Sequence, residues 1–375
     1  MAGIYIHIPF CRQACHYCNF HFSTTLALQN DFTAALLKEI ILRVPYLHDE
    51  PVETIYFGGG TPSLLSAASI RRILESIDHH FRVSRDAEIT LEANPDDMDA
   101  ERLSSWKSAG INRLSIGIQS FFLEDLQWMN RAHNAKQSVE AVEIAKKAGF
   151  DNFSLDLIYG SPGLTDKKWE ENLRQAVSLE PSHLSCYALT VEPKTALAQM
   201  IILKKTPAIE PGVQAAQFLK GIQMLEEAGY EHYEISSFAK PGKRSLHNSA
   251  YWQSKKYLGL GPSAHSFDGV SRQWNVSNNA RYIESLMDDK LCFDMESLKP
   301  MDILNEYIMT SLRTAEGLDL RQVEDYFGKE KGDLLKNNAN VFIRSNKMNH
   351  SDHKLILTLE GKLFADGIAS ALFFD

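Results

Sequence analysis

The sequence predicts an α/β fold, a partial (β/α)6 TIM-type barrel followed by a C-terminal, mainly helical, winged-helix-like domain. Two observations predict it. Up to residue 189, six short runs rich in β-branched residues alternate with stretches of helical periodicity, which favours a parallel sheet with crossover helices. After about residue 290 the pattern changes to short helices with a strand. In a barrel of this kind, functional side chains gather at the C-terminal ends of the strands.

The barrel elements follow in order along residues 1–240, which we expect to form the first domain. β-branched and alternating runs bounded by Gly or Pro predict strands at 3–8, 53–57, 87–92, 113–118, 152–157 and 183–189. Apolar residues at helical spacing predict helices at 31–44, 70–81, 100–109, 135–148 and 169–179. Gly110 and Gly149 end two of these helices. A helix at 214–228 and a strand-like run at 230–237 complete the domain.

The rest of the chain divides at about residue 290. Residues 241–290 are expected to be a linking segment, because 246–279 are rich in Ser, Asn, Gly and aromatics and show little periodicity. Residues 291–375 are expected to form the second domain. Its pattern predicts helices at 301–313, 320–327, 332–337 and 361–371 and a strand at 355–359. Three helices with a strand pair are typical of a winged-helix module.

Composition argues against several classes of protein. The hydrophobic content of 44% and charged content of 23% are ordinary for a globular protein. A net charge of −9 gives nucleic-acid binding no support. We find no apolar run of about 18 residues and no signal-peptide pattern, so we expect a cytoplasmic protein without a membrane segment. Five cysteines, three in one short window, make a poor disulfide framework, and we expect Cys186 and Cys292 to be buried free thiols.

The three clustered cysteines follow the first predicted strand, in Cys11-Arg12-Gln13-Ala14-Cys15-His16-Tyr17-Cys18. Three thiolates at this spacing can hold one iron–sulfur cluster and leave one iron of a cubane open. The alternative is a zinc site, which needs four N or S ligands. No second cysteine pair follows, although histidines at positions 7, 16 and 21 are near enough to complete such a site.

Other polar or glycine-rich stretches also follow predicted strands. Gly58-Gly59-Gly60-Thr61-Pro62 lets the backbone approach a ligand, or is simply a tight loop. Glu92, Gln119 and Asp156 each close an apolar strand. The carboxylates can accept hydrogen bonds from the hydroxyls of a ligand, or all three can be structural groups at the barrel rim whose hydrogen bonds are made within the protein. Arg131 can bind a carboxylate bidentately, or lie on the surface.

The C-x3-C-x-aromatic-C run resembles the signature of the radical S-adenosylmethionine (SAM) enzymes, in which the open iron chelates SAM. Further segments narrow this resemblance to the oxygen-independent coproporphyrinogen III oxidases and their haem-chaperone relatives, the HemW-like proteins. It covers about the first 270 residues. The segments that carry it are Tyr5-Ile6-His7-Ile8-Pro9-Phe10-Cys11, Gly58-Gly59-Gly60-Thr61-Pro62-Ser63, Leu91-Glu92-Ala93-Asn94-Pro95, Ser115-Ile116-Gly117-Ile118-Gln119-Ser120-Phe121 and Asp156-Leu157-Ile158-Tyr159-Gly160.

The resemblance implies roles for particular residues. The cluster ligands are Cys11, Cys15 and Cys18, and the SAM contacts are Tyr5, Gly59, Gly60, Thr61, Glu92, Gln119, Arg131 and Asp156, with Tyr17 between two cluster ligands as a further candidate. Tyr5 and Tyr17 can equally be packing residues.

Two features distinguish the subgroups. The oxidases carry a cysteine two residues after the third cluster ligand, where this chain has Phe20. The segment His247-Asn248-Ser249-Ala250-Tyr251-Trp252 matches the H-N-x-x-Y-W motif associated with haem in the chaperones. This implies that His247 ligates haem iron while Tyr251 and Trp252 face the porphyrin. His265 is a weaker second candidate.

These features imply a haem chaperone with the radical SAM fold, which binds a [4Fe–4S] cluster, SAM and haem and transfers haem to an acceptor such as a respiratory enzyme. A reductant for the cluster is a further expected partner. The alternative is a coproporphyrinogen III oxidase that acts by SAM-dependent radical decarboxylation on a porphyrinogen, so whether the protein is an enzyme stays open. A third hypothesis, a nucleic-acid reader built on the C-terminal module, is disfavoured by the acidic charge.

Overall fold

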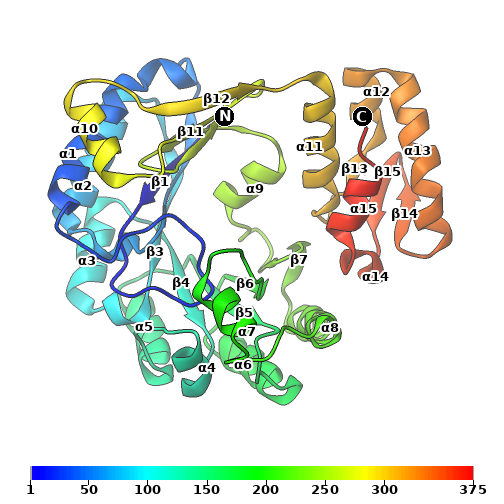
Figure 1. Cartoon of the computed structure of the whole chain (residues 1–375), viewed down its shortest axis with the longest axis horizontal. Coiled ribbons are helices and arrows are strands. Elements are labelled where there is room, and N and C mark those ends of the chain that lie inside the picture. The colour runs from blue at the N-terminus through cyan, green and yellow to red at the C-terminus, as the bar shows by residue number, and fades with distance from the viewer. Residues whose placement is uncertain (1, 375) are drawn as a thin grey trace.

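The computed structural model describes residues 2–374. Its first part is built from six parallel strands, each followed by one or more helices, and the C-terminal helices stand to one side (Figure 1). The strands are β1 (Ala2–Ile8), β2 (Val52–Gly59), β3 (Val83–Ala93), β4 (Arg113–Gln119), β5 (Phe153–Tyr159) and β6 (His183–Ala188). The helices among and after them are α1 (Gln29–Leu42), α2 (Ala67–His80), α3 (Ala100–Ala109), α4 (Leu123–Trp128), α5 (Ala135–Lys147), α6 (Asp166–Ser178), α7 (Ala196–Ile202) and α8 (Pro211–Glu227). The predicted α/β fold is confirmed, as an open sheet rather than a closed barrel.

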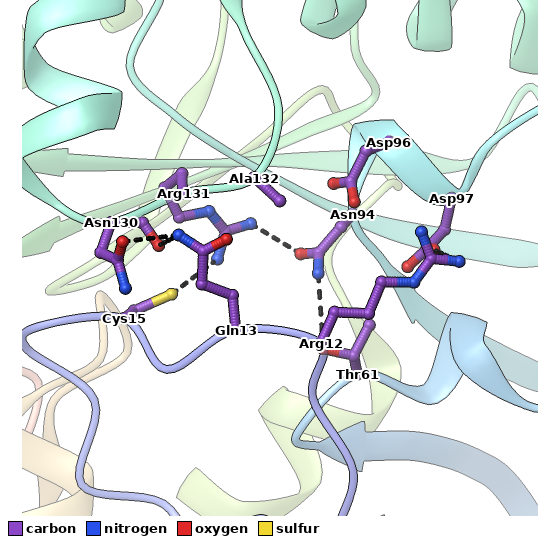
Figure 2. A pocket seen from close by; sticks show the side chains of 10 residues that line it. All are labelled: Arg12, Gln13, Cys15, Thr61, Asn94, Asp96, Asp97, Asn130, Arg131 and Ala132. Atoms are coloured by element: carbon purple, nitrogen blue, oxygen red, sulfur yellow. Dashed lines mark hydrogen bonds and ion pairs between the residues drawn. The ribbon is translucent and has the colours of Figure 1, made fainter. Parts of the chain in front are cut away.

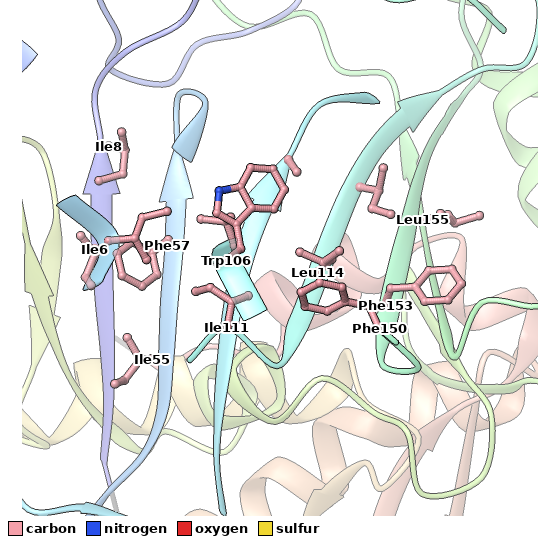
Figure 3. Close-up of a cluster of buried hydrophobic side chains, with 14 of the residues drawn as sticks. Ile6, Ile8, Ile55, Phe57, Trp106, Ile111, Leu114, Phe150, Phe153 and Leu155 are labelled. Atoms are coloured by element: carbon pink, nitrogen blue, oxygen red, sulfur yellow. The ribbon is translucent and has the colours of Figure 1, made fainter. Parts of the chain in front are cut away.

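The six parallel strands divide their side chains between two faces, because successive residues of a strand point to opposite sides. The outer face carries the buried apolar side chains drawn in Figure 3, and the helices pack over it. The labelled residues of this core are Ile6, Ile8, Ile55, Phe57, Trp106, Ile111, Leu114, Phe150, Phe153 and Leu155. The inner face carries polar and aromatic side chains, among them Tyr5 and Tyr56, which are paired in register. The sheet therefore offers its inner face for chemistry.

The sheet continues beyond residue 240. Its order is β12-β11-β10-β9-β1-β2-β3-β4-β5-β6-β8-β7, and β9 pairs parallel to β1. The added elements are β7 (Glu231–Glu234), β8 (Ser237–Ala239), α9 (Leu246–Trp252), β9 (Lys256–Leu260), β10 (His265–Phe267), β11 (Ser271–Asn275), α10 (Asn279–Met287) and β12 (Phe293–Ser297). Residues 241–290, expected to be a linking segment, thus contain three strands of the main sheet and two helices.

Some local predictions differ from the structure. Helices α4 and α7 were not predicted, because each has only six or seven residues and too few turns to show a period. Cys186 is buried as predicted, but Cys292 is only half-buried, because it lies in the connection between α10 and β12.

The C-terminal part has its own apolar core and a three-stranded sheet of order β13-β15-β14. Its elements are α11 (Pro300–Leu312), β13 (Leu318–Asp319), α12 (Leu320–Phe327), α13 (Lys329–Arg344), β14 (Met348–Ser351), β15 (Lys354–Leu357), α14 (Leu359–Lys362) and α15 (Ala365–Ala371). The helix predicted at 332–337 is longer, and the one predicted at 361–371 is split at Leu363 and Phe364. A β-bridge between Glu234 and Thr314 joins this part to the edge of the main sheet.

Among residues 2–374, no helix is both long and apolar enough to cross a membrane.

Candidate functional site

The cysteine loop leaves β1 at Pro9 and runs beside the glycine loop that leaves β2. The amides of Gly60 and Thr61 donate to the carbonyls of Ile8 and Phe10 at 2.8 and 2.7 Å. A Cβ on Gly60 would lie 2.6 Å from the Phe10 oxygen. Gly60 is therefore required by the contact between the two loops, a role distinct from the ligand contact that the resemblance implies.

The three cysteines lie close together at the C-terminal ends of the strands. The Thr61 hydroxyl donates to Cys11 Sγ at 3.4 Å, and Arg131 Nη1 donates to Cys15 Sγ at 3.5 Å. Cys18 follows in the same turn, with its amide donating to the Cys15 carbonyl at 3.3 Å. Two of the three sulfurs thus already accept hydrogen bonds from the protein.

This donor set fits an iron–sulfur cluster. Burial raises the pKa of Cys11 to about 11 and also raises that of Cys18, so a metal must displace protons from these thiols to bind. Within residues 2–374, no three His, Cys, Asp or Glu side chains are arranged around a point that a single metal ion would occupy. Three thiols in one loop are a donor set for an iron–sulfur cluster that leaves one iron open.

Contacts with the segment after α4 hold the cysteine loop in place (Figure 2). Gln13 Nε2 donates to Asn130 Oδ1 at 2.5 Å, and Asn130 Nδ2 donates to the Ala14 carbonyl at 2.7 Å. His16 Nδ1 lies 2.7 Å from the Trp128 carbonyl. This bond gives His16 a structural partner, which accounts for one of the histidines considered for zinc.

Arg131 connects the cysteine loop with the ends of β3 and β4, as Figure 2 shows. Its Nη2 donates to Asn94 Oδ1 at 2.6 Å and to the Gly117 carbonyl at 2.9 Å. A small cavity of about 20 Å³ beside Cys15 is lined by Arg131 and Asn94. Gln119 has a left-handed backbone with φ of 66°, at a bulge that directs its amide toward Gly117. Gly117 therefore lies beside both side chains, since a Cβ there would lie 3.0 Å from Gln119 Nε2 and 3.1 Å from Arg131 Nη2.

Two carboxylates occupy the inner face below this group. Tyr56 OH donates to Glu92 Oε1 at 2.8 Å, and burial raises the pKa of Glu92 to about 7. Asp156 accepts from Ser115 and Ser154 at 3.0 and 3.2 Å, and burial raises its pKa too. Both groups are placed to accept from a ligand hydroxyl.

The three aromatic residues of the cysteine region have different surroundings. Tyr5 lies on the inner face, where its ring centroid is 6.1 Å from that of Tyr56. Tyr17 packs against a small apolar cluster that includes Met129 and Leu197, so a packing role accounts for it. Phe20 is 65% exposed, at the position where the oxidases have a cysteine.

His247 points into the inner face from α9, at the end of the sheet opposite the cysteines. It is 2% exposed, and its Nδ1 lies 2.8 Å from Thr54 Oγ1 while its Nε2 lies 3.0 Å from Tyr251 OH. The Tyr56 ring stacks on it at 5.0 Å, and a Cβ on Gly3 would lie 3.2 Å from its Cε1. Burial, reinforced by Arg113, lowers the pKa of His247 to about 3, so the ring is neutral.

A buried ion pair holds the start of α9. Glu88 Oε1 accepts from the amides of Leu246 and His247 at 3.0 and 3.1 Å, which satisfies two amides of the first helical turn. Arg113 Nε lies 3.8 Å from Glu88 Oε2, and both side chains are buried. Glu88 and Arg113 therefore position the histidine.

Trp252 does not lie beside His247. The two are five residues apart, or about 140° around the helix, and Trp252 lines a cleft toward the C-terminal part instead. Tyr251 does contact His247, edge to face at 5.0 Å. His265, the second haem candidate, is exposed on β10 near Trp274.

Sequence reasoning missed Asn94, Thr54, Glu88 and Arg113. Asn94 lies just past the end of β3, where its amide donates to Thr61 Oγ1 and accepts from Arg131 Nη2. Its position two residues beyond a predicted site residue at a strand end was a usable signal. The other three lie far along the chain from the histidine that they hold, so no local pattern marks them.

The sequence is similar to known proteins over nearly its whole length. Residues 5–176 match the radical SAM superfamily, and residues 298–364 match the HemN C-terminal domain. The "Heme chaperone HemW" of Bacillus subtilis is 33% identical, covering 99% of both chains, and that of Haemophilus influenzae is 35% identical over 96% of this chain and 95% of the relative. The protein of that name from Escherichia coli is 33% identical over 98% of this chain and 96% of the relative.

A solved structure has the same fold. Coproporphyrinogen III oxidase (HemN) from Escherichia coli superimposes with a TM-score of 0.86 at 24% identity, covering 99% of this chain and 90% of that one. Sequence and fold agree, and the chain belongs to the radical SAM superfamily and, within it, to the HemW family.

Proposed function

We propose that this protein is a haem chaperone that carries a [4Fe–4S] cluster and SAM, binds haem and delivers it to an acceptor protein. The observation that carries the proposal is the similarity, at 33 to 35% identity over nearly the full length, to proteins named heme chaperone. Membership of the radical SAM superfamily implies the cluster and SAM. The name of the relatives supports haem as the ligand.

The cluster would be held by Cys11, Cys15 and Cys18. SAM would lie over the glycine loop and the inner face, where Arg131 offers a cation and Glu92 and Asp156 offer acceptors. The cluster would supply electron transfer to bound SAM. The chain's own contribution is a loop pinned through Gln13 and Asn130, which fixes where the cluster lies.

Haem iron would be ligated by His247. Its neutral imidazole has the right protonation state for an axial ligand. Ligation through Nε2 requires the ring to exchange the Tyr251 hydroxyl, 3.0 Å away, for iron. The bond from Nδ1 to Thr54 would then orient the ring, as second partners orient metal-bound histidines.

The test is a haem titration of anaerobically reconstituted protein followed by absorbance. His247→Ala should shift the Soret band and weaken haem binding at least ten-fold, whereas His79→Ala, an exposed histidine on α2, should leave both unchanged. Haem binding by His247→Ala that equals the wild type would refute ligation by this residue. Multiple turnover of coproporphyrinogen III by the wild type would refute the chaperone assignment in favour of oxidase activity.

The acceptor would be a haem protein such as a respiratory enzyme, reached in the cytoplasm, and a reductant would be needed for the cluster. Incubation of haem-loaded protein with an apo-cytochrome, followed by the spectrum of the acceptor, tests transfer directly. No gain of acceptor haem above that from free haem would count against delivery.

A further inference from the structure

A cleft of about 230 Å³ separates the outer side of α9 from the C-terminal part. Trp252 and Ser249 of α9 line one side, with Tyr233 and Arg244 beside them. Tyr307 of α11 and Lys354 of β15 line the other side. We infer that this cleft docks the carboxylate-bearing edge of a planar tetrapyrrole, so that the C-terminal part contributes directly to binding. The inference deepens the proposed haem-chaperone function and rests on it.

The aromatic side of the cleft suits a flat ligand. Trp252 is half-buried, and its indole N–H has no hydrogen-bond partner within the described chain. The Arg313 guanidinium lies 5.1 Å from its ring and covers part of it, which fixes the indole's orientation. Tyr233 is fixed in a similar way, by the Arg244 guanidinium at 5.0 Å and by a hydrogen bond of 2.8 Å between its hydroxyl and His183. The cleft therefore has rigid aromatic walls before any ligand arrives.

The charges in the cleft leave one cation available. Arg244 is already paired with Glu316 at 2.6 Å. The Lys354 ammonium has no ion pair or hydrogen bond with any residue from 2 to 374. Asp319, which faces Lys354 in strand register, directs its carboxylate to the Arg321 amide at 2.9 Å.

A hydroxyl in the cleft is also free. Ser249 Oγ is buried and has no partner among the described residues, although buried polar atoms are rarely left unpaired. An anionic ligand would thus find an unpaired ammonium and an unpaired hydroxyl on opposite walls. Carboxylate oxygens accept hydrogen bonds from an ammonium and from a hydroxyl, so a ligand that bears carboxylates suits these two groups.

The size of the cleft indicates how much of the ligand it would hold. Pockets that enclose a small ligand usually exceed about 300 Å³, so a cleft of about 230 Å³ would hold one edge and leave the rest exposed. That suits a protein that must release its ligand to another. Because His247 lies on the far side of α9, docking in the cleft does not require iron, and ligation is a separate event.

The test uses metal-free protoporphyrin IX and its dimethyl ester, titrated into the full-length protein by fluorescence. Lys354→Ala should weaken protoporphyrin IX binding roughly ten-fold, the loss expected for one charge-assisted hydrogen bond. Lys336→Ala, an exposed lysine on α13 outside the cleft, should bind like the wild type. The ester should bind wild type and Lys354→Ala equally, because it has no carboxylate for the ammonium to contact.

Other outcomes separate the inference from the function on which it rests. Wild-type protein that binds haem but not protoporphyrin IX would refute docking in the cleft and leave the proposed chaperone function intact. An equal loss in Lys336→Ala, or an ester that is as sensitive to Lys354→Ala as the acid, would also overturn it. Wild-type protein that binds neither haem nor protoporphyrin IX would overturn both. Matching melting temperatures of the two lysine variants would show that folding is not the cause of a difference.

Discussion

The hydrogen bond between Thr54 and His247 predicts the effect of Thr54→Val on stability. The hydroxyl of Thr54 lies 2.8 Å from the ring nitrogen, and both residues are buried. Valine has the same shape but leaves Nδ1 without a partner, which costs about 1–3 kcal/mol of unfolding free energy. Thr90→Val is the matched control, because Thr90 is 0% exposed on the neighbouring strand and its hydroxyl has no partner. Removing that hydroxyl should be neutral or stabilising.

The assay is urea unfolding of the cluster-free protein at pH 7.5, with wild type and both variants measured together. Thr54→Val should unfold at lower urea than Thr90→Val, with a difference of about 2 kcal/mol. In a His247→Phe background the difference should disappear, because the nitrogen that needs the hydroxyl is gone. Equal stability of Thr54→Val and Thr90→Val would refute the described position of the histidine ring.

Three further predictions follow from the same structure. Gly60→Ala should abolish the cluster absorbance near 400 nm after reconstitution, because its Cβ would meet backbone at 2.6 Å, whereas Gly212→Ala, with nothing within 4 Å, should reconstitute normally. Glu88→Gln and Arg113→Met should each lower the unfolding free energy by about 3–5 kcal/mol, because each leaves a buried charge unpaired. A double variant that loses more unfolding free energy than the two single variants together would contradict the pairing. The carboxyl of Glu92 has a pKa raised to about 7, so its contribution to stability is greatest below about pH 4 and is lost as pH rises through 7. Wild type should therefore lose stability relative to Glu92→Gln between pH 5 and pH 8. Unfolding free energies from urea that change in parallel with pH in the two proteins would contradict the raised pKa.

The central strands could be predicted because each carries its own signal. β-branched or alternating residues mark β1 to β6 locally, and the outer face supplies the apolar residues that the pattern detects. The strands β9 to β11 have three to five residues each, and β9 pairs with β1, more than 200 residues upstream. The buried carboxylate of Glu39, on α1, accepts from Gly261, Asn275 and Tyr282 and so fixes this region. A polar anchor more than 200 residues upstream leaves no periodic trace in the segment that it holds.

The site was predictable where it followed strand ends and not where it depended on a helix face. Glu92 and Gln119 were expected to close their strands, and the structure places them at the C-terminal ends of β3 and β4. The H-N-x-x-Y-W motif suggested one shared surface for His247 and Trp252. Because 246–252 forms a helix, the two residues face different spaces. A linear motif does not show which face each of its residues takes.

The pairing of β1 with β9 also affects the time at which this protein completes its fold during synthesis. β1 is made long before one of its two partners, because β9 begins at Lys256. At 5–20 residues per second, one side of β1 stays unpaired for roughly 10 to 50 s. An unpaired strand edge attracts other chains, so the nascent protein is open to aggregation in this interval. The cysteine loop, attached to the end of that strand, is complete long before the sheet closes beside it.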